Sequence, residues 1–137
     1  MFNRIMVPVD LTHADRLAKA LNVAGDLAAH YGAQLVYVGV TASTPSSIAH
    51  TPKEYGEKLA AFAKAQGLAA GATAEAHPVT THDPAVDLDP ALVKAAEETG
   101  ADLVVMASHI PGIADHFWPS NGGTIASRAR VSVMVVR

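Results

Sequence analysis

The chain contains no cysteine, and this absence excludes several classes of protein at once. Disulfide scaffolds, cysteine-ligated zinc or iron–sulfur centres and thiol catalysis all require that side chain. Charged residues make up only 17% of the sequence, the formal net charge is -3, and no block of basic residues is present. Nucleic-acid binding usually depends on a concentrated positive surface. We therefore expect no nucleic-acid partner.

Long apolar segments are also missing from the sequence. No apolar run approaches the roughly 18 residues that are needed to cross a membrane. The first residues run directly into a strand pattern and lack the features of a secretory signal. We expect a cytoplasmic protein with no membrane partner. With 137 residues, half of them hydrophobic, the chain is long enough for one globular domain over residues 1–137.

Two hydrophobic patterns alternate along the chain. Short apolar runs rich in β-branched residues predict strands, and apolar residues at three- and four-residue steps predict helices. We expect strands over residues 5–9, 34–40, 73–79, 103–107 and 131–136. We expect helices over residues 17–31, from residue 52 onward, and over 91–98 and 121–130. This order predicts a single α/β domain with an open five-stranded, mostly parallel sheet and helices on both faces.

Glycine and proline mark several of the predicted boundaries. Gly32 and Gly100 are natural helix ends, because glycine adopts the left-handed conformation that closes a helix. Pro52 suits the first turn of the second helix, and Pro90, preceded by an aspartate, suits the start of the third. Pro78 cannot donate a hydrogen bond to a neighbouring strand, so we expect it at the edge of the sheet or at the end of the third strand.

In an open parallel sheet, ligands bind at the carboxyl ends of the strands, where the strand order reverses. This rule selects residues 9–11, 40–41 and 107–109, which follow the first, second and fourth predicted strands. Asp10 offers a carboxylate for a ribose hydroxyl or a magnesium ion, or alternatively caps the helix that follows. His109 either contacts a phosphate or ribose or is a solvated loop residue.

The start of the last predicted helix is a second candidate for ligand binding. Free backbone N–H groups at a helix start, together with the helix dipole, attract anions such as phosphate. Ser120 or Asn121 can cap this helix, and Gly122 and Gly123 would let a ligand approach the backbone closely. The alternative is an ordinary cap, with the glycines packed against a neighbouring element.

Several catalytic and cofactor motifs are absent. The sequence lacks the Gly-x-Gly-x-x-Gly of dinucleotide sites, the phosphate loop of NTPases and the Gly-x-Ser-x-Gly of hydrolases. Its seven histidines include no pair at the spacing of a helical metal site, so we expect no metal centre. No lysine or arginine adjoins the candidate phosphate site to stabilise a transferring phosphoryl group. We expect no catalytic residues and, at most, slow ATP hydrolysis.

Four segments together resemble the universal stress protein family, and the resemblance covers the whole chain. The segment at 4–10 is similar to the family's first strand, which ends in Pro-x-Asp. The segments at 35–40, 101–106 and 132–137 are similar to its second, fourth and closing strands. The resemblance implies a Rossmann-like fold of the adenine nucleotide alpha hydrolase type.

The nucleotide loop departs from the usual family pattern. Nucleotide-binding members carry Gly-x-x-Gly and, further along the chain, Gly-Ser or Gly-Thr; we align these four positions with Ala107, Ile110, Pro119 and Ser120 of this chain. The sequence instead resembles a small branch with Ala-Ser-His-x-Pro and Ser-Asn in these places, some of whose members bind ATP. Pro119 removes one N–H, and Ile110 adds bulk. We therefore expect a phosphate-binding helix end of reduced strength.

The resemblance implies binding of ATP or another adenine nucleotide, with or without Mg²⁺. Backbone near Pro8, Val9 and Val40 would then frame the adenine, and Asp10 and Ala107 would lie at the ribose. The phosphates would contact four further residues: Ser108, His109, Ser120 and Asn121. Two alternatives remain at this stage. One is a family member that has lost the nucleotide and acts through protein contacts, and the other is a weak nucleotide hydrolase that uses His109 with Asp10.

The last predicted strand, which begins at Val131 and ends at Val136, presents an apolar edge. An exposed edge of this kind needs to be covered or paired. Pairing with the same strand of a second copy around a two-fold axis satisfies both edges. The resemblance implies the same homodimer, acting as a regulatory module in a stress response.

Overall fold

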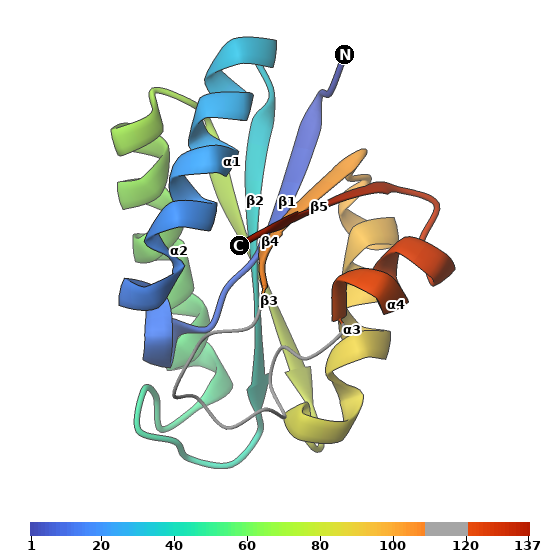
Figure 1. The fold of residues 1–137 in the computed structure, drawn as a ribbon. Coiled ribbons are helices and arrows are strands. Elements are labelled where there is room, and N and C mark those ends of the chain that lie inside the picture. Colours follow the sequence, from blue (N-terminus) through green and yellow to red (C-terminus); the bar gives the residue numbers. More distant parts are fainter. Residues whose placement is uncertain (109–120) are drawn as a thin grey trace.

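The structure is a computed structural model that describes residues 1–108 and 121–137, with only the backbone described for Asn121. All pairings between the strands of its sheet are parallel, in the order β3-β2-β1-β4-β5 (Figure 1). The strands are β1 (Arg4–Pro8), β2 (Gln34–Ala42), β3 (Ala74–Thr81), β4 (Leu103–Ala107) and β5 (Ser132–Val136). The helices are the 3-10 helix η1 (Leu11–Leu17), α1 (Ala18–Tyr31), α2 (Pro52–Ala70), α3 (Pro84–Thr99) and α4 (Asn121–Arg128).

The helices cover both faces of the sheet, as the alternation of patterns predicts. Helices α1 and α2 lie on one face, and α3 and α4 lie on the other (Figure 1). Successive side chains of a strand point to opposite faces, so each central strand contributes to both apolar layers. In β1, for example, Ile5 and Val7 are buried with α1 and α2, whereas Met6 is buried with α3 and α4.

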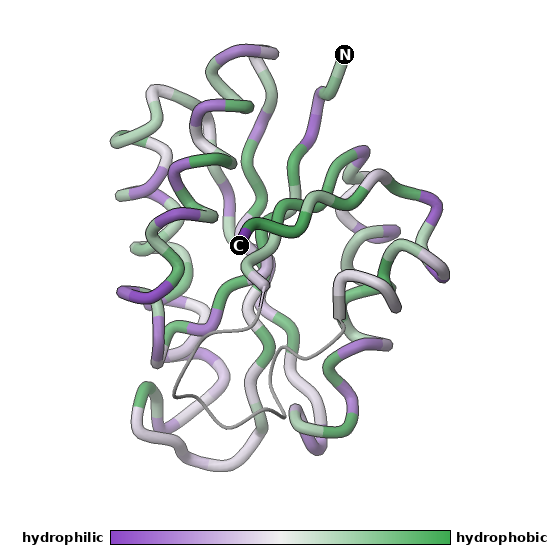
Figure 2. The backbone as a smooth tube through the Cα atoms, viewed as in Figure 1, coloured by the Kyte–Doolittle hydropathy of each residue, from purple (hydrophilic) through white to green (hydrophobic). Residues whose placement is uncertain are grey.

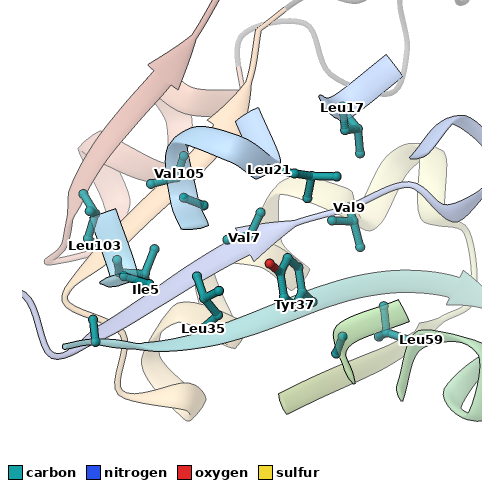
Figure 3. Packing of buried hydrophobic residues seen from close by; sticks show 14 of the residues in the cluster. Ile5, Val7, Val9, Leu17, Leu21, Leu35, Tyr37, Leu59, Leu103 and Val105 are labelled. Atoms are coloured by element: carbon teal, nitrogen blue, oxygen red, sulfur yellow. The ribbon is translucent and has the colours of Figure 1, made fainter. Parts of the chain in front are cut away.

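Hydrophobic residues are concentrated where the sheet meets its helices. Figure 2 shows the inner strands mainly in the hydrophobic colour and many hydrophilic residues on the outer turns of the helices. Figure 3 shows Val7 of β1, Tyr37 of β2 and Leu21 of α1 meeting in the layer under α1 and α2. Burial raises the pKa of the Tyr37 phenol to about 12. This packing anchors the first two strands between the helices on one face of the sheet.

The helix boundaries are set by local capping, and one of them differs from the prediction. Gly32 and Gly100 end α1 and α3 with φ of 64° and 67°, as their positions predict. The start of α3 at Pro90 is wrong, because the helix begins six residues earlier at Pro84. The Asp83 carboxylate accepts a hydrogen bond from the Ala85 N–H (3.1 Å) and caps that earlier start. Pro90 lies inside the helix.

Two of the strands end later than predicted, whereas β1 ends one residue earlier, at Pro8. β2 continues to Ala42 and β3 to Thr81, and the two remain paired through these last residues. β3 is an edge strand that contains Pro78, in agreement with the prediction. Within residues 1–108 and 121–137, no helix is both long and apolar enough to cross a membrane.

Candidate functional site

The carboxyl end of β1 turns directly into a helix that Asp10 caps. The Val9 N–H still donates to the Val38 carbonyl of β2 (2.8 Å), so the strand pairing continues to this point. One Asp10 carboxylate oxygen accepts from the Thr12 N–H (3.0 Å), and the other lies 2.9 Å from His13 Nδ1. Asp10 therefore caps the helix that follows it, which is one of the two alternatives that the sequence predicts. The carboxylate also remains partly exposed, with acceptor capacity to spare.

Two adjoining pockets open at the ends of β1 and β2. The narrow pocket, with a volume of about 50 Å³, is mainly apolar and lies between these strand ends and α3; it is lined by Val9, Asp10, Val38, Val40, Pro84, Leu88 and Leu92. The wide pocket has a volume of about 350 Å³ and is lined by residues 10–13, 40–42 and 83–85 together with Ser46, Ile48 and Tyr55. The two pockets share Asp10, Val40 and Pro84, so they lie side by side.

One wall of the wide pocket is formed by Tyr55, whose ring lies over Gly39 of β2. Tyr55, from the first turn of α2, exposes only 5% of its surface and packs over Gly39 of β2. A methyl group at Gly39 would lie 2.2 Å from the Tyr55 hydroxyl oxygen, so no larger residue fits beside this ring. Burial, together with the negative charge of Asp10, raises the pKa of the Tyr55 phenol far above its usual value. The hydroxyl therefore remains protonated and able to donate a hydrogen bond.

The sequence matches the family model of the universal stress protein family over residues 1–137. The chain belongs to the universal stress protein family. Its parallel five-stranded sheet with helices on both faces is the fold of a universal stress protein. No curated protein matches the chain significantly.

Solved universal stress protein structures share this fold. A universal stress protein in complex with cAMP is 25% identical, has a TM-score of 0.71, and is matched over 99% of this chain and 97% of that one. A universal stress protein from Archaeoglobus fulgidus in complex with dAMP is 20% identical, with a TM-score of 0.66 and 98% of both chains covered. A family protein from Arabidopsis thaliana with AMP bound is 15% identical, with a TM-score of 0.68, covering 98% of this chain and 90% of that one.

The structure brings together three of the predicted site residues of this universal stress protein. Val9, Asp10 and Val40 all line the narrow pocket, and Asp10 and Val40 also line the wide one. Pro8 is buried in the last position of β1, opposite Val38, and lines neither pocket. It therefore supports the strand end rather than forming part of the pocket wall.

The end of β4 lies beside β5. Ala107 is half-buried against the apolar layer under α1. The Ser108 N–H donates to the Val136 carbonyl (2.8 Å), so this amide continues the pairing between β4 and β5. A phosphate contact through the backbone of Ser108 would compete with that bond, which leaves its hydroxyl as the group for a ligand. His109 and Ser120 lie outside the described residues, as does the side chain of Asn121.

The two glycines at the start of α4 have different surroundings. A methyl group at Gly122 would lie 2.5 Å from a Val135 side-chain carbon, so this glycine packs against β5, as the alternative interpretation holds. A methyl group at Gly123 would meet nothing within 4 Å in the described part of the chain. Among the described residues, therefore, none fills the space beside Gly123.

Three residues with titratable side chains line the wide pocket and were not predicted as site residues from the sequence. They are His13, Tyr55 and Asp83, which belong to η1, α2 and the cap of α3. The apolar spacing of α2 assigns Tyr55 to the core, which is correct for its ring but says nothing of its hydroxyl. A glycine inside a β-branched strand indicates close approach by another group. Gly39 is the signal that points to Tyr55.

Proposed function

We propose that this universal stress protein binds ATP or another adenine nucleotide, with or without Mg²⁺, and acts as a regulatory module. The observation that carries the proposal is the wide pocket at the carboxyl ends of β1 and β2. Ligands of open parallel sheets bind at this position. A volume of about 350 Å³ lies at the small end of the roughly 300–1,000 Å³ range of ligand pockets. That space suits the nucleoside part of a nucleotide.

The apolar and polar groups of the site suggest how the nucleotide lies. Val9 and Val40 offer apolar contacts to the flat adenine ring, while the Asp10 carboxylate suits ribose hydroxyls. The phosphates would extend past Ala107 toward the start of α4, where the contacts would come from Ser108, His109, Ser120 and Asn121. The relatives solved with cAMP, dAMP and AMP support an adenine nucleotide as the ligand class.

The narrow pocket requires a local adjustment when the base enters. Its volume of about 50 Å³ holds no more than one or two water molecules. Leu88 and Pro84 of α3 form its outer wall, so a small outward shift of the start of α3 would join it to the wide pocket.

The second candidate function is that of a family member that has lost nucleotide binding and acts through protein contacts. The small volume and the packed Gly122 favour that candidate.

A regulatory role suits the charges around the site better than phosphoryl transfer does. Asp10 and Asp83 line the wide pocket, and no lysine or arginine is among the described residues that line either pocket. Phosphoryl transfer relies on positive groups that stabilise the developing charge. We accordingly propose a cytoplasmic binding module whose hydrolytic activity, if measured, is slow.

Nucleotide binding can be tested with two neighbouring substitutions in α3. Ala85 is exposed and lines the wide pocket, so the indole of Ala85→Trp should fill the site and weaken AMP and ATP binding at least tenfold. Val86 is 73% exposed and lines neither pocket, so Val86→Trp should bind like the wild type. The measurement is calorimetric titration, after any nucleotide that co-purifies has been identified by denaturing the protein and separating the supernatant.

Two results would contradict the proposed function. The first is no saturable binding of ATP or AMP at millimolar concentration, together with no co-purified nucleotide; this would favour the member that acts through protein contacts. The second is equal binding by Ala85→Trp and Val86→Trp, which would place the nucleotide elsewhere.

A further inference from the structure

The start of α3 is joined to the rest of that helix by a weak link. Pro90 lies inside α3 and has no N–H, so the carbonyl of Val86, four residues earlier, receives no helical hydrogen bond. The proline ring also crowds that carbonyl, which bends or loosens a helix at this point. Val86 is 73% exposed, so water can reach the free carbonyl. α3 can therefore bend at Pro90 more easily than elsewhere along its length.

The segment before this link, residues 83–89, is held together by its own hydrogen bonds. The Asp83 carboxylate accepts from the Ala85 N–H (3.1 Å), and the Asp87 carboxylate accepts from the Asp83 N–H (3.1 Å). These bonds are local, so a bend at Pro90 leaves them intact. The segment also contributes to the lining of both pockets. Any movement of it about Pro90 therefore changes the width of the narrow pocket.

Two buried polar atoms beside this segment have no partner. Among the described residues, the Thr81 hydroxyl oxygen and the Asp89 Oδ1 atom are both shielded from water, and neither forms a hydrogen bond. Buried polar atoms are nearly always bonded, because losing water without a replacement costs free energy. A hydroxyl can donate to a carboxylate oxygen, so the two atoms are chemically matched. Asp89 directly precedes Pro90, which places it on the movable side of the link.

The two residues lie at the same level between β3 and α3. His77 Nε2 and Glu98 Oε2 are 3.3 Å apart, so these residues mark a common level near the end of α3. Thr81 lies about 13 Å beyond His77 along β3, on the same face of the strand. Asp89 lies about 14 Å before Glu98 along α3, which runs opposite to β3 (Figure 1). A small displacement of the segment can therefore bring the hydroxyl to the carboxylate.

We propose that residues 83–89 form a gate beside the narrow pocket, which moves about Pro90 between a closed and an open position. The closed position is the one in this structure, where the narrow pocket holds about 50 Å³ and Thr81 and Asp89 are not bonded to each other. In the open position the narrow pocket joins the wide one, and the Thr81 hydroxyl donates to the Asp89 carboxylate. A bond that the closed position lacks stabilises only the open one. That the gate admits a nucleotide rests on the proposed function, whereas the movement itself does not.

Amide hydrogen exchange of the protein without ligand tests the hinge. Pro90→Ala supplies the missing N–H to the Val86 carbonyl, so the amides of residues 87–89 should exchange about 3- to 10-fold more slowly than in the wild type. Pro52→Ala is the matched control, because Pro52 lies in the first turn of α2, where a proline removes no helical bond. It should leave exchange in α3 unchanged. Equal exchange of residues 87–89 in Pro90→Ala and the wild type would overturn the hinge.

A double-mutant cycle tests the bond between Thr81 and Asp89. Thr81→Val and Asp89→Ala each remove the bond from the open position, so each should slow exchange of residues 87–89 about 3- to 10-fold. The double variant should be no slower than the single variants. Thr80→Val is the control, because Thr80 is exposed and lies on the other face of β3. Additive effects in the double variant, or no effect in the single ones, would show that the two residues do not act as a pair.

The rate of AMP association connects the gate with the ligand. Stopped-flow mixing should show association about 3- to 10-fold slower for Pro90→Ala and Thr81→Val, and wild-type rates for Pro52→Ala and Thr80→Val, once thermal unfolding shows that all four are folded. Slowed exchange with unchanged association would overturn the gating role. If the wild type itself binds no AMP, the proposed function fails, and the exchange measurements still decide whether the hinge exists.

Discussion

At the scale of single residues, the shape of the wide pocket depends on Gly39, because this residue has no side chain. Gly39 lies in β2 with its missing side chain directly under the Tyr55 ring. Glycine is a weak strand former and needs a local reason to lie inside a strand. Here the reason is steric, because the ring can pass over β2 and reach the wide pocket only if no Cβ is present.

This contact predicts a large effect of a small substitution. In Gly39→Ala the new methyl group would overlap the Tyr55 hydroxyl, so we expect a loss of about 1–3 kcal/mol in the free energy of unfolding. Adding Tyr55→Phe removes the closest atom, so the double variant should lose less than the sum of the two single variants. Urea unfolding of the four proteins measures this coupling.

Gly56→Ala provides the control for that experiment. Gly56 lies in α2, and a methyl group there would make only an ordinary contact of 3.7 Å with Pro78. Because alanine favours helices over glycine, this variant should be equal to the wild type or up to about 1 kcal/mol more stable. Equal stability of Gly39→Ala and Gly56→Ala would show that the Tyr55 ring does not depend on the space at Gly39.

The sequence predicts those residues of the site whose place follows from topology. Val9, Asp10 and Val40 follow strands in the chain, and the strand-end rule selects them before any side-chain geometry is known. Tyr55 enters from a helix on one face of the sheet, and Asp83 enters from the cap of another helix. Their arrival at the same pocket depends on how helices pack across strands, which local patterns do not specify.

At the scale of elements, the wide pocket lies where two capped helix starts meet the end of β2. η1 begins after Asp10, whose carboxylate accepts from the Thr12 N–H. α3 begins after Asp83, whose carboxylate accepts from the Ala85 N–H, and the Asp87 carboxylate in return accepts from the Asp83 N–H. These reciprocal bonds resemble a capping box and hold the first turn of α3 beside the pocket.

The cap of α3 can be tested by separating its hydrogen bond from its charge. Asp83→Ala removes the acceptor and should cost about 1 kcal/mol in the free energy of unfolding. Asp83→Asn keeps an acceptor and should remain near the wild type. Amide hydrogen exchange should show the loss of protection in Asp83→Ala confined to the first turn of α3. An equal effect of both substitutions would contradict the capping role.

The same helix start shows why proline alone predicts the boundary of α3 poorly. Two prolines, Pro84 and Pro90, each follow an aspartate, so the sequence offers two equivalent start signals. The structure uses the first, where Asp83 caps the helix, and Leu88 then packs in the apolar layer under α3. Tertiary packing of the extra turn decides between the two starts, and this turn supplies part of the pocket wall.

At the scale of the whole molecule, the sheet has two edges with different chemistry. β3 carries Pro78 and polar side chains, features that discourage pairing with another strand. β5 pairs only with β4 in the described chain and exposes 40% of Met134 and 46% of Val135. Because the Val136 carbonyl accepts from Ser108, the backbone groups of Val133 and Val135 point to the open edge. This edge is suited to pairing with a second copy.

The proposed homodimer through β5 is therefore open to a direct test. Met134→Lys places a charge on the exposed apolar surface of the strand and should convert the dimer to monomer, because pairing two such strands would bring like charges together. Leu68→Lys is the control. Leu68 is 77% exposed on α2, so this substitution adds the same charge to an exposed surface outside β5. Analytical ultracentrifugation should give the mass of two chains for the wild type and Leu68→Lys, and of one chain for Met134→Lys. A monomeric wild type would show that the apolar edge of β5 is not a self-association surface.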